Sequence, residues 1–212
     1  MAESMGLRER KKLQTGLRIW RTAVELFLER GFDHVSVMEI AEASDVSKMT
    51  VFNYFGSKED LVFLPMEEHF GDVARAVRDR RPGESAVAAV RRYFLEMIET
   101  RDASVGLSPD PFVRQVRQLV MDTPALLERA FLASRQGEQE LIEALMEEGE
   151  ERLPASLAAA LLIAARNTLI EEHHRRASEG QSPEEIAAAA VDLAHRAFDQ
   201  VENGMGGYAV RP

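Results

Sequence analysis

Helix-start signals recur along this chain of 212 residues, whereas the alternating Val, Ile and Thr runs of β-strands are nearly absent. Ala, Leu, Glu and Arg dominate, and most of these residues are strong helix formers. The sequence therefore predicts an all-α protein of about nine helices. They are expected at about 13–30, 37–43, 47–55, 58–80, 84–101, 112–121, 124–148, 154–179 and 183–202.

Two helix starts are marked especially clearly. Ser36 and Glu39 have the spacing of a capping box, and Val35 with Ile40 can form the hydrophobic staple around it. The run Ser182-Pro183-Glu184-Glu185 combines a second capping box with proline at the first helical position. These signals predict helices that begin at about 37 and 183.

The first expected helix carries one apolar stripe and ends at Gly31, a typical C-terminal cap. The spacing of the apolar residues alternates between three and four, so all of them should face the core. They are Leu13, Leu17, Trp20, Val24 and Phe27.

Two short helices follow, and only a short break around 43–46 separates them. A longer helix followed by such a pair describes a helix-turn-helix unit, which binds DNA through its second short helix. Helical periodicity places Val51 and Phe55 on the face toward the core. The outward face is expected to carry Met49, Thr50, Phe52 and Asn53.

The segment SVMEIAEASDVSKMTVFNYFGSKEDLV, residues 36–62, resembles the DNA-binding region of the TetR family of transcriptional regulators. The resemblance covers about residues 10–65. Asp45 departs from the pattern, because the family usually has glycine there in a left-handed turn, and Phe52 stands where tyrosine is commoner. The matching motifs are Ile40-Ala41, Val46-Ser47, Phe52, Tyr54-Phe55 and Ser57-Lys58-Glu59-Asp60-Leu61.

The resemblance implies that the helix at about 47–55 enters the major groove of DNA. There Met49 and Thr50 can offer methyl groups to thymine, and Asn53 can bind adenine through two hydrogen bonds. The positions expected to contact DNA bases or phosphates are Ser36, Ser47, Lys48, Met49, Thr50, Phe52, Asn53, Tyr54 and Lys58. A basic N-terminal arm with Arg8, Arg10, Lys11 and Lys12 could reach the DNA backbone or the minor groove.

Charge is distributed unevenly along the chain, whose formal net charge is −10. Residues 1–60 hold nine Lys/Arg against ten Asp/Glu, or −1, and residues 61–212 hold seventeen against twenty-six, or −9. This asymmetry favours a DNA-binding domain at 1–60 and a different domain at 61–202, followed by a disordered tail at 203–212.

In the family that the chain resembles, the second domain binds a small effector inside a helical bundle, and its last two helices form a homodimer. The resemblance thus implies a cytoplasmic, ligand-responsive repressor that binds an inverted-repeat DNA operator. The effector, of unknown identity, is expected to be apolar or amphipathic, and neither a cofactor, a metal nor a membrane is expected. Candidate effector-binding residues are Phe70, Tyr93, Phe94, Met97, Phe112, Val116, Phe131, Arg166, Asn167 and His173.

Two other classes of protein remain open. A metal-dependent enzyme could use Glu171 and His174, which share a helical face, together with His69 or His195. A helical interaction protein could have kept the motif without binding DNA, and the acidic total favours that alternative. The chain has no cysteine, and no apolar run approaches the roughly 18–20 residues of a membrane-spanning helix. We therefore expect a protein that is not an enzyme.

Overall fold

The computed structural model describes residues 6–63, 66 and 69–204. Within these ranges the chain is all-α, with ten α-helices, two short 3-10 helices and no strand. The helices are α1 (Leu7–Arg30), η1 (Phe32–His34), α2 (Val37–Ala43), α3 (Lys48–Tyr54), α4 (Asp60–Phe63), α5 (Asp72–Arg78), α6 (Ala86–Glu99), η3 (Ala103–Val105), α7 (Pro111–Asp122), α8 (Pro124–Met146), α9 (Arg152–Ser178) and α10 (Pro183–Asn203).

The chain forms two compact units, one from residues 1–68 and 112–132 and the other from 69–111 and 133–212. The first unit therefore extends beyond the predicted boundary at residue 60 and also includes α7 and the beginning of α8. The predicted domain boundary at residue 60 divides the chain by function and not by packing, and it stays a prediction. Of the expected tail, Asn203 ends α10 and Gly204 caps it, and residues 205–212 lie outside the described part of the chain.

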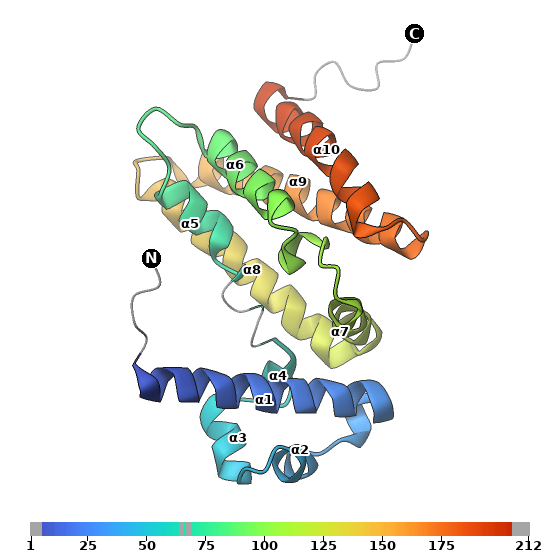
Figure 1. The fold of residues 1–212 in the computed structure, drawn as a ribbon. Helices are drawn as coiled ribbons and strands as arrows, with labels where there is room; N and C mark the ends of the chain where they lie inside the picture. The colour runs from blue at the N-terminus through green and yellow to red at the C-terminus, as the bar shows by residue number, and fades with distance from the viewer. Residues whose placement is uncertain (1–5, 64–65, 67–68, 205–212) are drawn as a thin grey trace. The chain divides into compact units, whose positions relative to one another are not determined.

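In the first unit, α1 packs against α2 and α4, and α2 packs against α3 (Figure 1). Phe27 of α1, Ile40 of α2 and Val51 of α3 are each at most 1% exposed. Trp20 donates its indole N–H to the carbonyl of Val62 at 3.1 Å, which ties α1 to α4. The short helices are therefore held by long-range contacts, since a seven-residue helix is marginal alone.

In the second unit, α10 packs against both α9 and α6, and α6 also packs against α5 (Figure 1). The rings of Phe94 and Phe198 meet edge to face at a centroid distance of 6.0 Å. His173 stacks on Phe94 from α9 at 6.2 Å. Aromatic and aliphatic side chains thus join three helices in one core.

Two predictions about helices need correction. The helix expected at 58–80 is not continuous, because α4 ends at Phe63 and α5 begins at Asp72. The interval contains Pro65, which lacks an amide donor, and Gly71, a weak helix former.

The apolar stripe of α1 also differs from the prediction. Leu13 and Leu17 are 48% and 40% exposed, whereas Ile19 and Ala23 are fully buried. Val24 and Phe27 are buried as expected, so the core-facing stripe is correct only in the second half of α1.

Candidate nucleic-acid interface and effector site

Local hydrogen bonds fix the start of the recognition helix α3 and the turn before it. Ser47 caps it, accepting a hydrogen bond from the Thr50 amide at 3.0 Å. In the turn before it, Asp45 has a φ of 52°, which confirms the left-handed conformation expected at this position. The amide of Val46 donates to the carbonyl of Ala41 at 3.0 Å, so the turn joins α2 directly to α3.

The two faces of α3 differ as the sequence predicts. Val51 and Phe55 are 1% and 3% exposed and form its support, whereas Met49 is 69% exposed and Phe52 is 45% exposed. Asn53 is also exposed. Met49, Phe52 and Asn53 therefore present apolar surface and an amide that can pair with adenine on one side of a helix seated by its buried face.

Other predicted DNA contacts from α3 lie at the edge of this face. Lys48 is exposed, and its Nζ lies 5.8 Å from the centre of the Phe52 ring. Thr50 is half-buried, with its hydroxyl 2.8 Å from that of Ser47. Tyr54 is half-buried beside Phe55, with ring centroids 6.3 Å apart.

The start of α2 is a complete capping box, as predicted. The Ser36 amide donates to Glu39 Oε2 at 2.8 Å, and the Glu39 amide donates to Ser36 Oγ at 3.2 Å. The bond from the Ser36 amide, with help from Arg30 and the Ser36 hydroxyl, lowers the pKa of Glu39 to about 2. A phosphate at this helix start would therefore meet amides already bonded and a carboxylate that stays charged.

Lys58 is half-buried and already bonded within the first unit. Its Nζ donates to the Phe32 carbonyl at 2.6 Å and lies 4.3 Å from the centre of the Phe32 ring. Of the two lysines predicted to contact phosphate, Lys48 is the one whose side chain is exposed.

The predicted basic arm is helical in the structure, because α1 begins at Leu7. Arg10, Lys11 and Lys12 are exposed on its first two turns. Their reach toward DNA is therefore set by the direction of α1.

The ten candidate effector residues fall into both compact units. Phe112, Val116 and Phe131 belong to the first, where Phe112 meets the edge of Trp20 at 5.6 Å and Phe131 is 64% exposed. The other seven belong to the second unit. There Phe94 and His173 are buried, Asn167 is exposed, and Phe70, Tyr93, Met97 and Arg166 are partly buried.

The second unit also contains a carboxylate that sequence reasoning missed. Asp72 is 7% exposed and accepts hydrogen bonds from Tyr93 Oη at 2.5 Å and Arg75 Nη1 at 2.5 Å, with His69 Nδ1 2.8 Å away. Burial opposes ionisation of Asp72, but the bonds to Tyr93 and His69 lower its pKa below the usual value. Burial and the bond to Asp72 raise the pKa of Tyr93, so its hydroxyl remains a donor.

Part of this network could have been anticipated. His69 and Asp72 are three residues apart, as are Asp72 and Arg75, and side chains at that spacing meet on a helix. Tyr93 is twenty-one residues from Asp72, and only the packing of α5 against α6 joins them.

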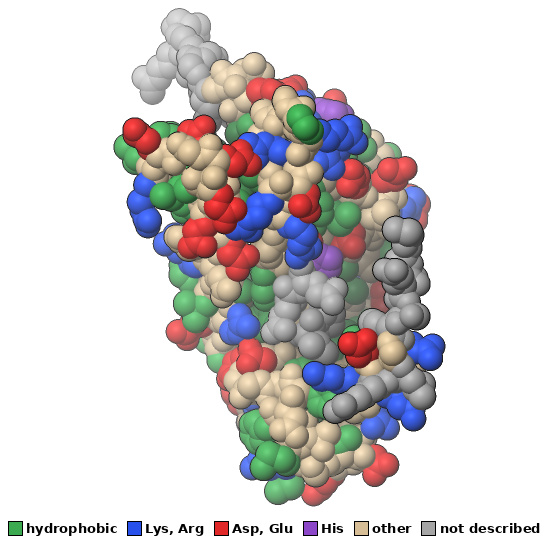
Figure 2. All heavy atoms as spheres, turned by 90° about the vertical axis from the view of Figure 1, so that its left-hand side faces the viewer, with side chains coloured by type: hydrophobic (Ala, Val, Ile, Leu, Met, Phe, Trp, Pro, Cys, Tyr) green, Lys and Arg blue, Asp and Glu red, His purple; other side chains and the backbone are tan. Residues whose placement is uncertain are grey.

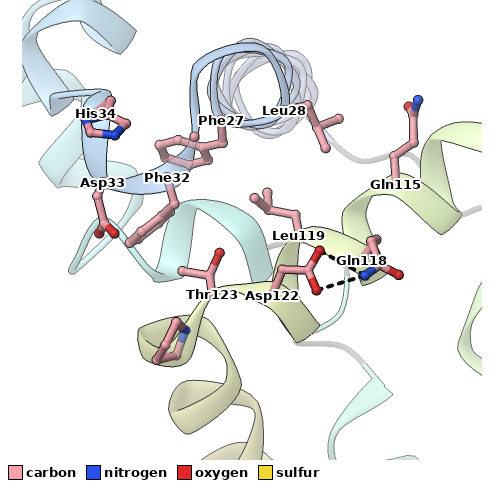
Figure 3. Close-up of a pocket in the computed structure, with 12 residues that line it drawn as sticks. Phe27, Leu28, Phe32, Asp33, His34, Gln115, Gln118, Leu119, Asp122 and Thr123 are labelled. Carbon is pink, nitrogen blue, oxygen red and sulfur yellow. Dashed lines mark hydrogen bonds between the residues drawn. The ribbon is translucent and has the colours of Figure 1, made fainter.

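An open pocket of about 470 Å³ lies in the first unit, near the end of α1 and the junction of α7 with α8 (Figure 3). Leu28 and Phe32 supply apolar surface, and Gln118 donates to both oxygens of Asp122 at 2.8 Å. None of the ten predicted effector residues lines it. Its acidic lining, with Asp33 and Asp122, does not suit nucleic-acid phosphates.

The structure bears on two further expectations, the alternative of a metal site and the absence of a helix long enough to span a membrane. Within 6–63, 66 and 69–204, no three His, Asp or Glu side chains are grouped so that they could hold a metal ion, so Glu171 and His174 do not form such a group with His69 or His195. Helix α9 is long and apolar enough to cross a membrane, with a window of mean hydropathy 1.5, so the statement that no run approaches this limit was wrong. The core helix of a soluble protein passes the same test.

An exposed short helix seated on two supporting helices defines the first unit as a helix-turn-helix module. Residues 19–63 match the family model described as bacterial regulatory proteins, tetR family. In this region, which contains the helix-turn-helix, the chain is similar to the TetR family.

Two curated relatives are similar to part of the chain. It is 33% identical over 123 residues to the HTH-type transcriptional regulator TcmR of Streptomyces glaucescens, a match that covers 58% of this chain and 54% of TcmR. It is 35% identical over 96 residues to the HTH-type transcriptional repressor DhaR of Mycobacterium sp. strain GP1, a match that covers 40% of this chain and 48% of DhaR. The chain thus spans about half the length of the curated relatives it matches.

Solved structures resemble the whole fold. NalD of Pseudomonas aeruginosa, the secondary repressor of the MexAB-OprM multidrug efflux pump, matches with a TM-score of 0.57 at 21% identity, covering 88% of this chain and 96% of NalD. SmeT in complex with triclosan also matches with a TM-score of 0.57, at 19% identity, covering 94% and 98%. At this identity the likeness shows the fold alone.

Proposed function

We propose that this protein is a ligand-responsive transcriptional regulator, and specifically a repressor. It binds an inverted-repeat operator as a homodimer in the cytoplasm, and a small effector releases it. The observation that carries the proposal is the exposed face of α3, where Met49, Phe52 and Asn53 stand over the buried Val51 and Phe55. The family match of residues 19–63 supports the same reading.

A homodimer would place two recognition helices about 34–36 Å apart, which is one turn of DNA. Exposed apolar residues on the last two helices support such an interface. Leu153, Leu157 and Leu161 follow one another at steps of four on α9 and are 80%, 61% and 42% exposed, and Val191 of α10 is 43% exposed. Such a stripe in water favours association.

Release by an effector would follow from linkage. If the effector favours a spacing of the recognition helices that the operator does not, effector and DNA weaken each other's binding by the same coupling free energy. The helical second unit, with its apolar core, is the place we propose for the effector. The structures of similar fold include a triclosan complex and a stearoyl-CoA complex, which supports an apolar or amphipathic ligand.

Gel-shift titration on the DNA upstream of the gene tests DNA binding. Affinity should fall as salt rises, because bound phosphates release counterions. Asn53→Ala should cost about 1–3 kcal/mol on the cognate sequence and relax base preference, whereas Lys48→Ala should weaken all sequences alike and reduce the salt slope by about 1.

Asn203→Ala is the matched control, because it removes an exposed asparagine from the end of α10 in the second unit and should leave DNA binding unchanged. Equal binding of cognate and scrambled DNA by the intact protein would contradict the proposal and favour a helical interaction protein.

A further inference from the structure

The inner face of α9 is interrupted by one arginine. Its buried residues are Ala155, Ala159, Leu162, Leu169 and His173, each at most 4% exposed. Their spacing is four, three, seven and four, and Arg166 falls inside the gap of seven, four residues after Leu162 and three before Leu169. The guanidinium therefore projects from the stripe that faces the core of the second unit.

The charge of Arg166 has no counterion in the described part of the chain. Nη1 donates to the neighbouring Asn167 Oδ1 at 3.2 Å, and Nε is enclosed without any acceptor. No described carboxylate forms an ion pair with it, and burial lowers its pKa. Arginine is seldom enclosed in this way without a partner, because desolvating an unpaired charge is costly.

The carboxylate of Asp72 does not supply the missing partner. Asp72 is near enough for its charge to favour the protonated form of Arg166, but it forms no ion pair with that guanidinium. The Asp72 oxygens are already bonded to Arg75 on one side and to Tyr93 and His69 on the other. The guanidinium thus lies near a polar network in which both oxygens of the carboxylate already have other hydrogen-bond partners.

We infer that Arg166 binds the carboxylate of a small monoanionic effector whose remaining part is apolar. A guanidinium matches a carboxylate with two parallel hydrogen bonds, and these are among the strongest in proteins. Ile163 and Ile170 flank Arg166 on α9 and are partly buried against the core, so they offer apolar surface on either side. The inference rests on the proposed function, because it names the chemistry of the effector.

Thermal unfolding of the full chain tests this site with defined probes. Acetate, benzoate and octanoate are compared with their neutral amides and with chloride at equal ionic strength. At least one carboxylate should raise the Tm of the wild type where its amide does not, since ligand binding to the folded state alone stabilises it. If no carboxylate raises the Tm above chloride, the inference is overturned.

The variant Arg166→Leu should have a higher Tm than the wild type without probe, because an apolar side chain replaces an unpaired charge in the stripe. It should also lose the carboxylate-dependent shift, with affinity reduced about tenfold or more. Arg166→Lys keeps the charge but loses the planar pair of N–H donors that matches a carboxylate, so it should bind the carboxylate more weakly than the wild type. If Arg166→Leu does not fold, an unchanged carboxylate shift in Arg166→Lys overturns the inference.

Arg176→Leu is the matched control on the same helix. Arg176 is also partly buried, but its Nε donates to Glu172 at 2.6 Å, so the variant should lose an ion pair and keep the carboxylate shift. An equal loss of the shift in both variants would contradict a role specific to Arg166.

Gel shifts separate the two proposals. Arg166→Leu should still bind the operator and should no longer be released by the carboxylate that stabilises the wild type. A protein that binds no operator but shows the Arg166-dependent Tm shift would refute the regulator and leave the anion site standing. A protein that binds the operator but shows no carboxylate-dependent Tm shift would refute the anion site and leave the regulator standing.

Discussion

At position 137, tertiary packing requires a glycine although helix propensity disfavours one there. Gly137 lies in the interior of α8, where alanine would be more favourable by about 0.8–1.0 kcal/mol on helix propensity. A Cβ built on Gly137, however, would lie 2.4 Å from the carbonyl oxygen of Phe70. That approach is possible for glycine only, because backbone atoms cannot yield as a flexible side chain does.

Gly137→Ala should therefore destabilise the protein, by about 1–3 kcal/mol as an overpacking substitution, although propensity alone favours it. The measurement is the midpoint of urea unfolding. Gly71→Ala is the comparison, since the nearest atom to its new Cβ would be the movable carboxylate of Glu140 at 2.8 Å. A more stable Gly137→Ala variant would show that α8 and Phe70 separate easily.

At the level of single residues, the sequence predicted the faces of α3 because that helix is short and capped on each side. Val51 and Phe55 are buried, and Met49 and Asn53 are exposed, as helical rotation requires. The internal bond of Lys58 was not predictable, because its acceptor, the Phe32 carbonyl, lies twenty-six residues away.

At the level of elements, helix α9 unites a buried histidine, an unpaired arginine and an exposed leucine stripe. His173 is fully buried, and Nδ1 lies 2.7 Å from the carbonyl of Val105, which fixes it as the donor nitrogen. Nε2 is enclosed and has no hydrogen-bond partner among the residues that the structure describes. Burial lowers the pKa of His173 from 6.5, more than the bond to Val105 raises it.

This burial predicts how stability depends on pH. The unfolded chain takes up a proton at His173 below about pH 6.5 while the folded protein resists it, so stability is complete above this pH and falls as the pH drops toward the lower folded pKa. His173→Asn can keep a donor toward Val105 and should shrink the Tm difference between about pH 7.5 and 5.5. His195→Asn, which removes an exposed imidazole from α10, is the control, and an equal reduction there would contradict the assignment.

At the level of the whole molecule, α9 has apolar residues on opposite sides. Its inner stripe packs in the core, and Leu153, Leu157 and Leu161 face outward. The two apolar sides together account for the high mean hydropathy of this helix. A second copy of the chain is the partner we propose for the outer side.

Leu157→Glu should convert the dimer to a monomer, because it places two charges in the apolar interface, and operator affinity should fall with it. Light scattering at micromolar concentration measures the oligomeric state. Leu132→Glu, on the similarly exposed Leu132 of α8, should leave the dimer intact. A wild-type protein that is monomeric at this concentration would rule out the proposed interface.

The sequence by itself determined the all-α class, most helix boundaries and the helix-turn-helix face, because caps, turns and helical periodicity act within a few residues. The capping boxes at Ser36 and Ser182 appear in the structure as predicted. The tertiary structure alone decided which polar groups have partners. Asp72 meets Tyr93 across α5 and α6, and Arg166 forms no ion pair with a carboxylate of the described residues, because such contacts depend on how distant helices pack.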